Sequence, residues 1–277
     1  MVLLGRGGPG EGTKALVRRQ PESRERRVKR AARRSSVDRP GYFPRVIERG
    51  PSADGDARCS SRSLLVACGL AAVFIGAAAL AWHGHVTSFD RTLTADVVRR
   101  PGGPLFRLGD GFSTVGSGAV VAVVGLGFAL VVWLRSRSLR FAMITPVASA
   151  VAATAELVGK HVVGRVRPPT AFYTGVAGFG FPSGHAAGFA AMAVAMAAVI
   201  GLVGSLATVR RVVWFAAIAA SAAVGLARIV VGAHYFVDVV GGLALGGFCA
   251  LVTLVVASQM SRLRARQRPG TRLPSPS

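Results

Sequence analysis

Long apolar stretches alternate with short polar segments over most of the chain. Each stretch is close to the ~20 residues that a helix needs to cross the hydrocarbon core of a bilayer. None shows the ten-residue alternation typical of a strand in a membrane barrel, so we expect helices. The pattern predicts an all-α fold, a six-transmembrane helix bundle, with spans over residues 64–82, 113–134, 141–159, 186–207, 212–232 and 236–258.

The two ends of the chain have a different pattern. Residues 1–63 are rich in Arg, Gly, Pro and Ser and show no lasting apolar period, which predicts a disordered basic N-terminal tail. Residues 259–277 form a second tail that is basic and rich in Pro and Ser. The first apolar stretch begins too far from Met1 for a signal peptide and is long enough to remain as a span. We therefore expect a membrane domain over residues 64–258 between two tails.

Composition and charge narrow the class of protein. Of the 277 residues, 51% are hydrophobic, yet the formal net charge is +22. An ordinary soluble domain does not combine these values, so a soluble α/β enzyme, a disulfide scaffold and a fibrous protein are excluded. Cys59, Cys68 and Cys249 form no CxxC pair, so neither a zinc site nor a disulfide framework is expected.

The basic residues of the short loops predict the orientation in the membrane. They follow the second, fourth and sixth spans, on the same side as the N-terminal tail: Arg135, Arg137, Arg140, Arg210, Arg211, Arg262, Arg264, Arg266 and Arg268. The positive-inside rule places that side in the cytoplasm, and we expect a multi-pass plasma-membrane protein with both termini inside. The basic tails are expected to contact anionic lipid headgroups, and no nucleic-acid partner is expected.

Three polar clusters fall on the opposite, extracytoplasmic side. One follows the third span, one precedes the fourth, and one joins the fifth span to the sixth. Because the spans alternate in direction, all three clusters meet at one face of the membrane. Their candidate functional residues are Lys160 and Arg167, then Ser183, Gly184 and His185, then Arg228, His234 and Asp238.

The chemistry of these clusters points to phosphate. Arg presents a planar fork of donors that matches phosphate oxygens, and Lys adds a point charge. Ser183 and Gly184 precede a helix, where backbone N–H groups can donate to an anion. His234 and Asp238 are four residues apart and share one face of a helical turn. The carboxylate can orient one ring nitrogen and leave the other as a nucleophile.

Some charged residues near the clusters have simpler interpretations. Arg228 alone could snorkel from the end of a span to the headgroups. Glu156 lies four residues before Lys160, so we expect an ion pair along one helix face rather than a catalytic role. Arg165 is expected to contact lipid headgroups, and His161 points away from the cluster on a helix.

Together, Lys160-x6-Arg167-Pro168, Pro182-Ser183-Gly184-His185 and Arg228-x5-His234-x3-Asp238 resemble a known signature. It is the three-part signature of the type 2 phosphatidic acid phosphatase (lipid phosphate phosphatase) superfamily, which also includes the vanadium haloperoxidases. One position departs from the pattern, because Ala227 stands where the third motif usually has Ser. We expect the missing hydroxyl to weaken the site modestly.

The resemblance implies a role for each position. His234 would attack phosphorus and form a phosphohistidine, with Asp238 orienting it, and His185 would protonate the leaving group and then help to activate water. The other members would bind the phosphoryl oxygens: Lys160, Arg167, Ser183, Gly184 and Arg228. No carboxylate cluster is available for a divalent cation, so we expect a phosphatase with no metal and no cofactor.

The leading hypothesis is an integral-membrane phosphatase. Its candidate substrates are undecaprenyl diphosphate, phosphatidic acid and phosphatidylglycerophosphate, and the sequence does not choose among them. The alternatives are a lipid transporter or scramblase that only binds headgroups, a membrane-tethered interaction protein acting through residues 1–63, and a haloperoxidase. The two histidines favour an enzyme over a binder, and the membrane spans disfavour the soluble haloperoxidases.

Overall fold

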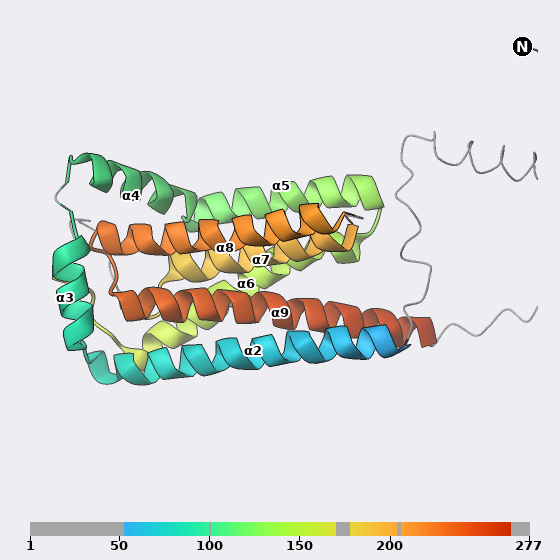
Figure 1. The fold of residues 1–277 in the computed structure, drawn as a ribbon, viewed down its shortest axis with the longest axis horizontal. Coiled ribbons are helices and arrows are strands. Elements are labelled where there is room, and N and C mark those ends of the chain that lie inside the picture. The colour runs from blue at the N-terminus through green and yellow to red at the C-terminus, as the bar shows by residue number, and fades with distance from the viewer. Residues whose placement is uncertain (1–52, 100, 170–177, 204–205, 267–277) are drawn as a thin grey trace, which may run out of the picture. The chain divides into compact units, whose positions relative to one another are not determined.

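The computed structural model describes residues 53–99, 101–169, 178–203 and 206–266. Residues 1–52, which make up most of the predicted N-terminal tail, and residues 267–277 lie outside this part of the chain. The described residues form helices joined by short loops, and the all-α prediction is confirmed (Figure 1). The α-helices are α2 (Ala53–Ala81), α3 (Ser88–Val97), α4 (Pro104–Val115), α5 (Gly118–Ser136), α6 (Leu139–Val163), α7 (Gly184–Val203), α8 (Ala207–Val230) and α9 (Phe236–Arg266).

Six of these helices are long and apolar enough to cross a membrane, which confirms the predicted bundle. Their candidate spans are Arg62–Gly84, Gly118–Ser136, Leu139–Val163, Gly184–Leu202, Ala207–Val230 and Phe236–Met260. The chain is a multi-pass membrane protein. The two shorter helices, α3 and α4, lie in the segment between the first two spans.

The helix boundaries differ from the predicted spans at several places. Helix α2 begins at Ala53, well ahead of the expected start near Leu64. The second span begins at Gly118 rather than near residue 113, because the Ser117 side chain caps α5 by accepting from the Val120 amide. Helix α6 continues to Val163, where Gly164 ends it in the left-handed conformation with φ of 63°.

Close contact between backbones fixes α7 against α9. Gly242 lies against the Ser183 carbonyl, where a Cβ atom would be 2.5 Å from its oxygen, and Gly246 lies directly against the Ala187 carbonyl. Small residues spaced four apart allow membrane helices to approach in this way. Since α7 and α9 both begin at the same end of the bundle, this contact sets the relative positions of two of the three polar clusters (Figure 1).

Candidate active site

The three polar clusters meet at one end of the bundle. Helices α6 and α8 end there, α7 and α9 begin there, and α3 lies across the same end (Figure 1). The turn between α8 and α9 is fixed by the Arg228 carbonyl, which accepts from the amides of Ala233 at 3.0 Å and His234 at 3.2 Å. His234 is therefore positioned by backbone bonds, and its side chain is 2% exposed.

The contacts of His234 define its tautomer. Its Nε2 atom lies 3.0 Å from Nη1 of Arg167, and a guanidinium has only donors, so Nε2 accepts. The neutral ring then carries its proton on Nδ1, which faces Oδ2 of Asp238 at 3.6 Å. That separation is an electrostatic contact rather than a full hydrogen bond. The lone pair on Nε2 is the one that a nucleophilic histidine needs.

Burial also sets the protonation state of His234. It lowers the pKa of the imidazole from 6.5 to about 4; Asp238 opposes this shift, whereas Arg167 and Arg228 add to it. At neutral pH the ring is consequently uncharged. A neutral imidazole with an unprotonated Nε2 can attack without a separate deprotonation step.

Arg167 is positioned by the loop that follows α6. Its Nε donates to the Gly178 carbonyl at 3.2 Å, and its Nη1 donates to the Ala233 carbonyl at 3.0 Å. Burial lowers the pKa of Arg167 below the ordinary value of 12.5, and Asp238 and Glu156 oppose that shift. Because an arginine side chain stays protonated in proteins, the guanidinium is a cation beside Nε2 of His234.

Ser183 differs in one respect from the prediction. Its backbone N–H donates to the Asp238 carbonyl at 3.0 Å, so this amide is already used and is not available to an anion. The expectation that this backbone group binds phosphate is wrong, because α9 uses it to hold the start of α7. The Ser183 hydroxyl, by contrast, is buried with no hydrogen-bond partner among the described residues. A buried hydroxyl of this kind is the free donor that a bound phosphate oxygen would satisfy.

Gly184 is required by a close approach. A Cβ atom there would lie 2.7 Å from Oε1 of Glu156. The same carboxylate oxygen forms an ion pair with Nζ of Lys160, which confirms the predicted pairing along α6. Glu156 therefore places Lys160 beside the first turn of α7. A side chain larger than hydrogen at position 184 would displace the Glu156 carboxylate.

Arg228 is held by a residue outside the three motifs. It is 4% exposed, and its Nη1 donates to the hydroxyl of Ser113 on α4. The interpretation of Arg228 as a side chain that snorkels to headgroups is wrong, because the guanidinium is buried at the site. Ala227 lacks the usual motif hydroxyl, and Ser113 gives Arg228 a hydroxyl partner from a different helix.

Arg165 does not contact lipid headgroups as the sequence predicts. Its side chain is 0% exposed and forms ion pairs with Asp238 and Asp90. Burial alone would lower the pKa of Arg165, but Asp238 and Asp90 raise it above its ordinary value. Asp90 was not singled out from the sequence. The only available signal was its acidity in a segment at the same membrane face as the clusters.

His185 is the second residue of α7 and is half-buried beside Gly116. A Cβ atom at Gly116 would lie 3.5 Å from Cβ of His185, so the break between α4 and α5 packs against this histidine. The structure thus brings all eight predicted residues to one end of the bundle. It adds Asp90, Ser113 and Arg165 to them.

Comparison with known proteins finds a family match over the part of the chain that holds the three motifs. The family model described as the PAP2 superfamily matches residues 137–262. These residues contain all three motifs, and this region of the chain is similar to the PAP2 superfamily. No match was found among the curated proteins.

Two solved structures are similar in fold. One is the crystal structure of the first transmembrane PAP2 type phosphatidylglycerolphosphate phosphatase from Bacillus subtilis, with a TM-score of 0.64 and 22% identity. The match covers 72% of this chain and 98% of that one. The other is LpxE from Aquifex aeolicus, with a TM-score of 0.48 and 17% identity over 62% of this chain and 98% of that one. The first similarity shows that the helical fold of a PAP2-type membrane protein is present here.

Proposed function

We propose that this protein is a phosphatase that removes a phosphate from a membrane lipid through a phosphohistidine intermediate, without a metal ion. The observation that carries the proposal is the neutral His234, whose Nε2 lone pair faces the cationic Arg167 at 3.0 Å. A phosphoryl group placed at this position would meet a nucleophile and a charge-stabilising donor together.

The order of events follows from the residues around His234. Arg167 would exchange its contact with Nε2 for the phosphoryl oxygens, together with Lys160, Arg228 and the Ser183 hydroxyl. Nε2 of His234 then forms a bond to phosphorus as the bond to the leaving oxygen breaks. His185, in its protonated form, gives the leaving oxygen a proton. It later takes a proton from water as the water oxygen bonds to phosphorus and the bond between Nε2 and phosphorus breaks, which releases phosphate and restores both histidines. Asp238 stabilises the positive charge that His234 carries in between.

The donor set supports a reaction without a metal. The carboxylates nearest the clusters are already bound by cations, Glu156 by Lys160 and Asp238 by Arg165. In the part of the chain that the structure describes, no three His, Cys, Asp or Glu side chains group together as a metal site would need. Arg and Lys side chains would supply the charge stabilisation that a metal provides in other phosphatases.

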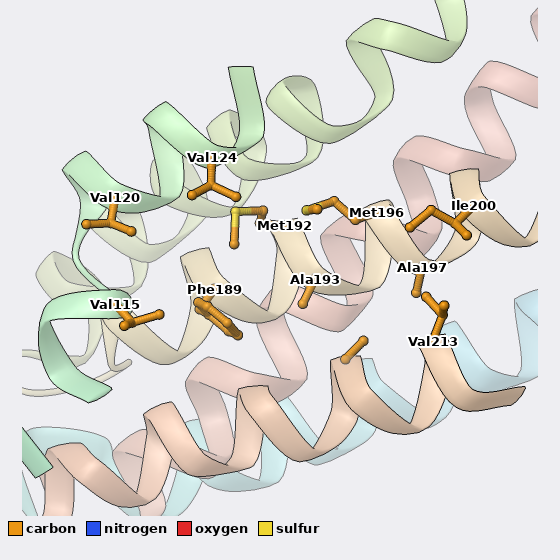
Figure 2. A pocket seen from close by; sticks show the side chains of 11 residues that line it. Val115, Val120, Val124, Phe189, Met192, Ala193, Met196, Ala197, Ile200 and Val213 are labelled. Atoms are coloured by element: carbon orange, nitrogen blue, oxygen red, sulfur yellow. The ribbon is translucent and has the colours of Figure 1, made fainter. Parts of the chain in front are cut away.

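A lipid substrate is supported by an apolar groove that starts beside the site. Its volume is about 310 Å³, within the range of ligand pockets, and α4, α5, α7 and α8 line it (Figure 2). Its outer end includes Val115, which adjoins Gly116, and Phe189, one helical turn after His185. Figure 2 shows side chains from α7 continuing along the groove to Ile200.

The length of the groove suits one hydrocarbon chain. From Phe189 to Ile200, α7 rises about 16 Å at 1.5 Å per residue, about half of the ~30 Å hydrocarbon core. We infer that the groove binds an acyl or prenyl chain while the phosphate lies at the end of the bundle. Together with the basic cytoplasmic loops, this arrangement supports a site on the extracytoplasmic face of the plasma membrane. Candidate substrates remain undecaprenyl diphosphate, phosphatidic acid and phosphatidylglycerophosphate.

The direct test is phosphate release by the purified protein in excess EDTA. We expect release from at least one of the three candidate lipids, at the same rate with and without EDTA, because Arg and Lys provide the charge stabilisation. The preferred lipid would identify the substrate. A folded protein that binds these lipids but releases no phosphate would favour the headgroup-binding transporter or scramblase, and sensitivity to EDTA would contradict the metal-independent mechanism.

Filling the groove tests how the lipid chain binds. Ala193→Phe places a ring among the lining side chains, and we expect the KM for a long-chain lipid phosphate to rise about tenfold. This corresponds to the loss of about two buried methylenes at ~0.8 kcal/mol each. Turnover of a short-chain, water-soluble phosphate ester should stay unchanged. Ala219→Phe is the matched control, since Ala219 is exposed on α8 and outside the groove lining. Equal effects of the two substitutions would contradict this use of the groove.

A further inference from the structure

Asp90 on α3 lies outside the three motifs, yet it is completely buried at the site. Both of its carboxylate oxygens are used: Oδ2 accepts from Nη2 of Arg165 at 2.5 Å, and Oδ1 accepts from the Val237 amide at 3.1 Å. Thr87 caps α3 by accepting from the Asp90 amide at 3.0 Å, so the backbone of Asp90 is also fixed. A fully buried carboxylate is costly unless it is paired in this way.

Arg165 joins Asp90 to the catalytic pair. Its Nη1 donates to Oδ1 of Asp238 at 2.6 Å, and its guanidinium lies 4.7 Å from the centre of the Tyr235 ring. A planar fork with both arms engaged cannot rotate without breaking an ion pair. By holding Oδ1, Arg165 sets the plane of the Asp238 carboxylate, whose Oδ2 faces His234 and also accepts from the Tyr235 amide at 3.0 Å.

The charges explain why a second carboxylate is needed. Arg165 paired with Asp238 alone would cancel the negative charge that should stabilise a cationic His234. Asp90 adds another negative charge on the far arm of Arg165, so the group of three keeps a net charge of −1. Because the group is buried, the change in net charge from zero to −1 has a large effect on His234, since charges interact more strongly at low dielectric.

We propose that Asp90 is a positioning residue, which acts through Arg165 to orient Asp238 and to keep it an effective partner for His234. The segment between the first two spans is thereby part of the working site rather than a simple connection. This inference rests on the proposed phosphatase activity. It adds to that activity two residues, Asp90 and Arg165, that the three motifs do not include.

The test uses Asp90→Asn in the full chain, with Asp96→Asn as the matched control. Asp96 is an exposed acid on the same helix, so its substitution removes the same charge from α3 without touching Arg165. We expect Asp90→Asn to lower kcat about 10-fold to 100-fold on long-chain and short-chain substrates alike, with KM nearly unchanged. Asp96→Asn should match the wild type.

A double substitution separates positioning from general destabilisation. If Asp90 acts through Asp238, the double variant Asp90→Asn with Asp238→Asn should be no slower than Asp238→Asn alone. A purely structural role predicts that the two losses multiply. Multiplied losses, or wild-type kcat in Asp90→Asn, would overturn the proposal.

Arg165→Lys provides a second variant if Asp90→Asn does not fold. A lysine keeps the charge but cannot hold two carboxylates in the geometry of a fork, so kcat should again fall with KM preserved. Thermal unfolding in detergent shows whether each variant is folded. Unchanged kcat in a folded Arg165→Lys would overturn the inference, whereas a wild-type chain without any turnover would overturn the proposed function on which it rests.

Discussion

Replacing His234 by glutamine is expected to lower phosphate release by about 10⁴-fold or more, the scale of loss seen when a catalytic nucleophile is removed. Glutamine has similar length and keeps polar atoms near Arg167 and Asp238, but it cannot form the covalent phosphoryl intermediate. Lipid binding should be largely retained, because the cations and the apolar groove are untouched. The measurement is phosphate release beside a lipid-binding assay on the same detergent-purified protein.

The wild-type chain should also become labelled by a substrate that carries a radioactive phosphate. In a rapid acid-free quench, we expect the label to be present in the wild type and absent from His234→Gln, because only the imidazole can accept it. Activity close to that of the wild type in the variant would contradict the mechanism. Full loss of both turnover and lipid binding would indicate a collapsed site. His161→Gln is the control for replacing a histidine by glutamine, because His161 is exposed near the end of α6.

The second large effect is expected for Arg167→Gln. Arg167 contacts Nε2 of His234 at 3.0 Å and is held by the carbonyls of Ala233 and Gly178, so it is already in place for the transferring phosphoryl group. Removing one such preorganised donor costs about 10²-fold to 10³-fold in kcat. We expect a loss of this size in kcat, with a smaller change in KM.

Arg167→Lys distinguishes charge from geometry at the same position. A lysine restores the positive charge without the planar fork, so it should recover only part of the lost rate. Arg107→Gln on the exposed face of α4 is the control for the loss of one cation near this end of the bundle. Equal kcat in the wild type and in Arg167→Gln would show that Arg167 plays no part in the chemical step.

Much of the site was predictable because the relevant signals are local, or depend only on the fact that successive spans cross the membrane in opposite directions. Apolar stretches of membrane-spanning length predicted six helices, and alternating direction placed all three clusters at one end. The four-residue spacing of His234 and Asp238 predicted a shared helical face, and their nitrogen and oxygen atoms lie 3.6 Å apart. The same spacing predicted the ion pair between Glu156 and Lys160.

The sequence predicted the ends of helices and the partners of individual cations less well. The start of the second span was placed early, because Ser117 caps α5 inside a continuous apolar stretch. Arg165 and Arg167 are two residues apart and of the same type, yet Arg165 binds two buried carboxylates while Arg167 contacts Nε2 of His234. In the sequence only the match of Arg167 to the first motif separates the two residues, and that match does not give their partners.

The sequence by itself determined the class of fold, the end of the bundle that holds the site, and the eight residues that match the three motifs. Only the tertiary structure decided which partners those residues have. Asp90 pairs with Arg165 from 75 residues away, and Ser113 binds Arg228 from 115 residues away. Hydropathy and helical period act over a few residues, whereas the partner of a buried charge depends on which distant helices pack around it.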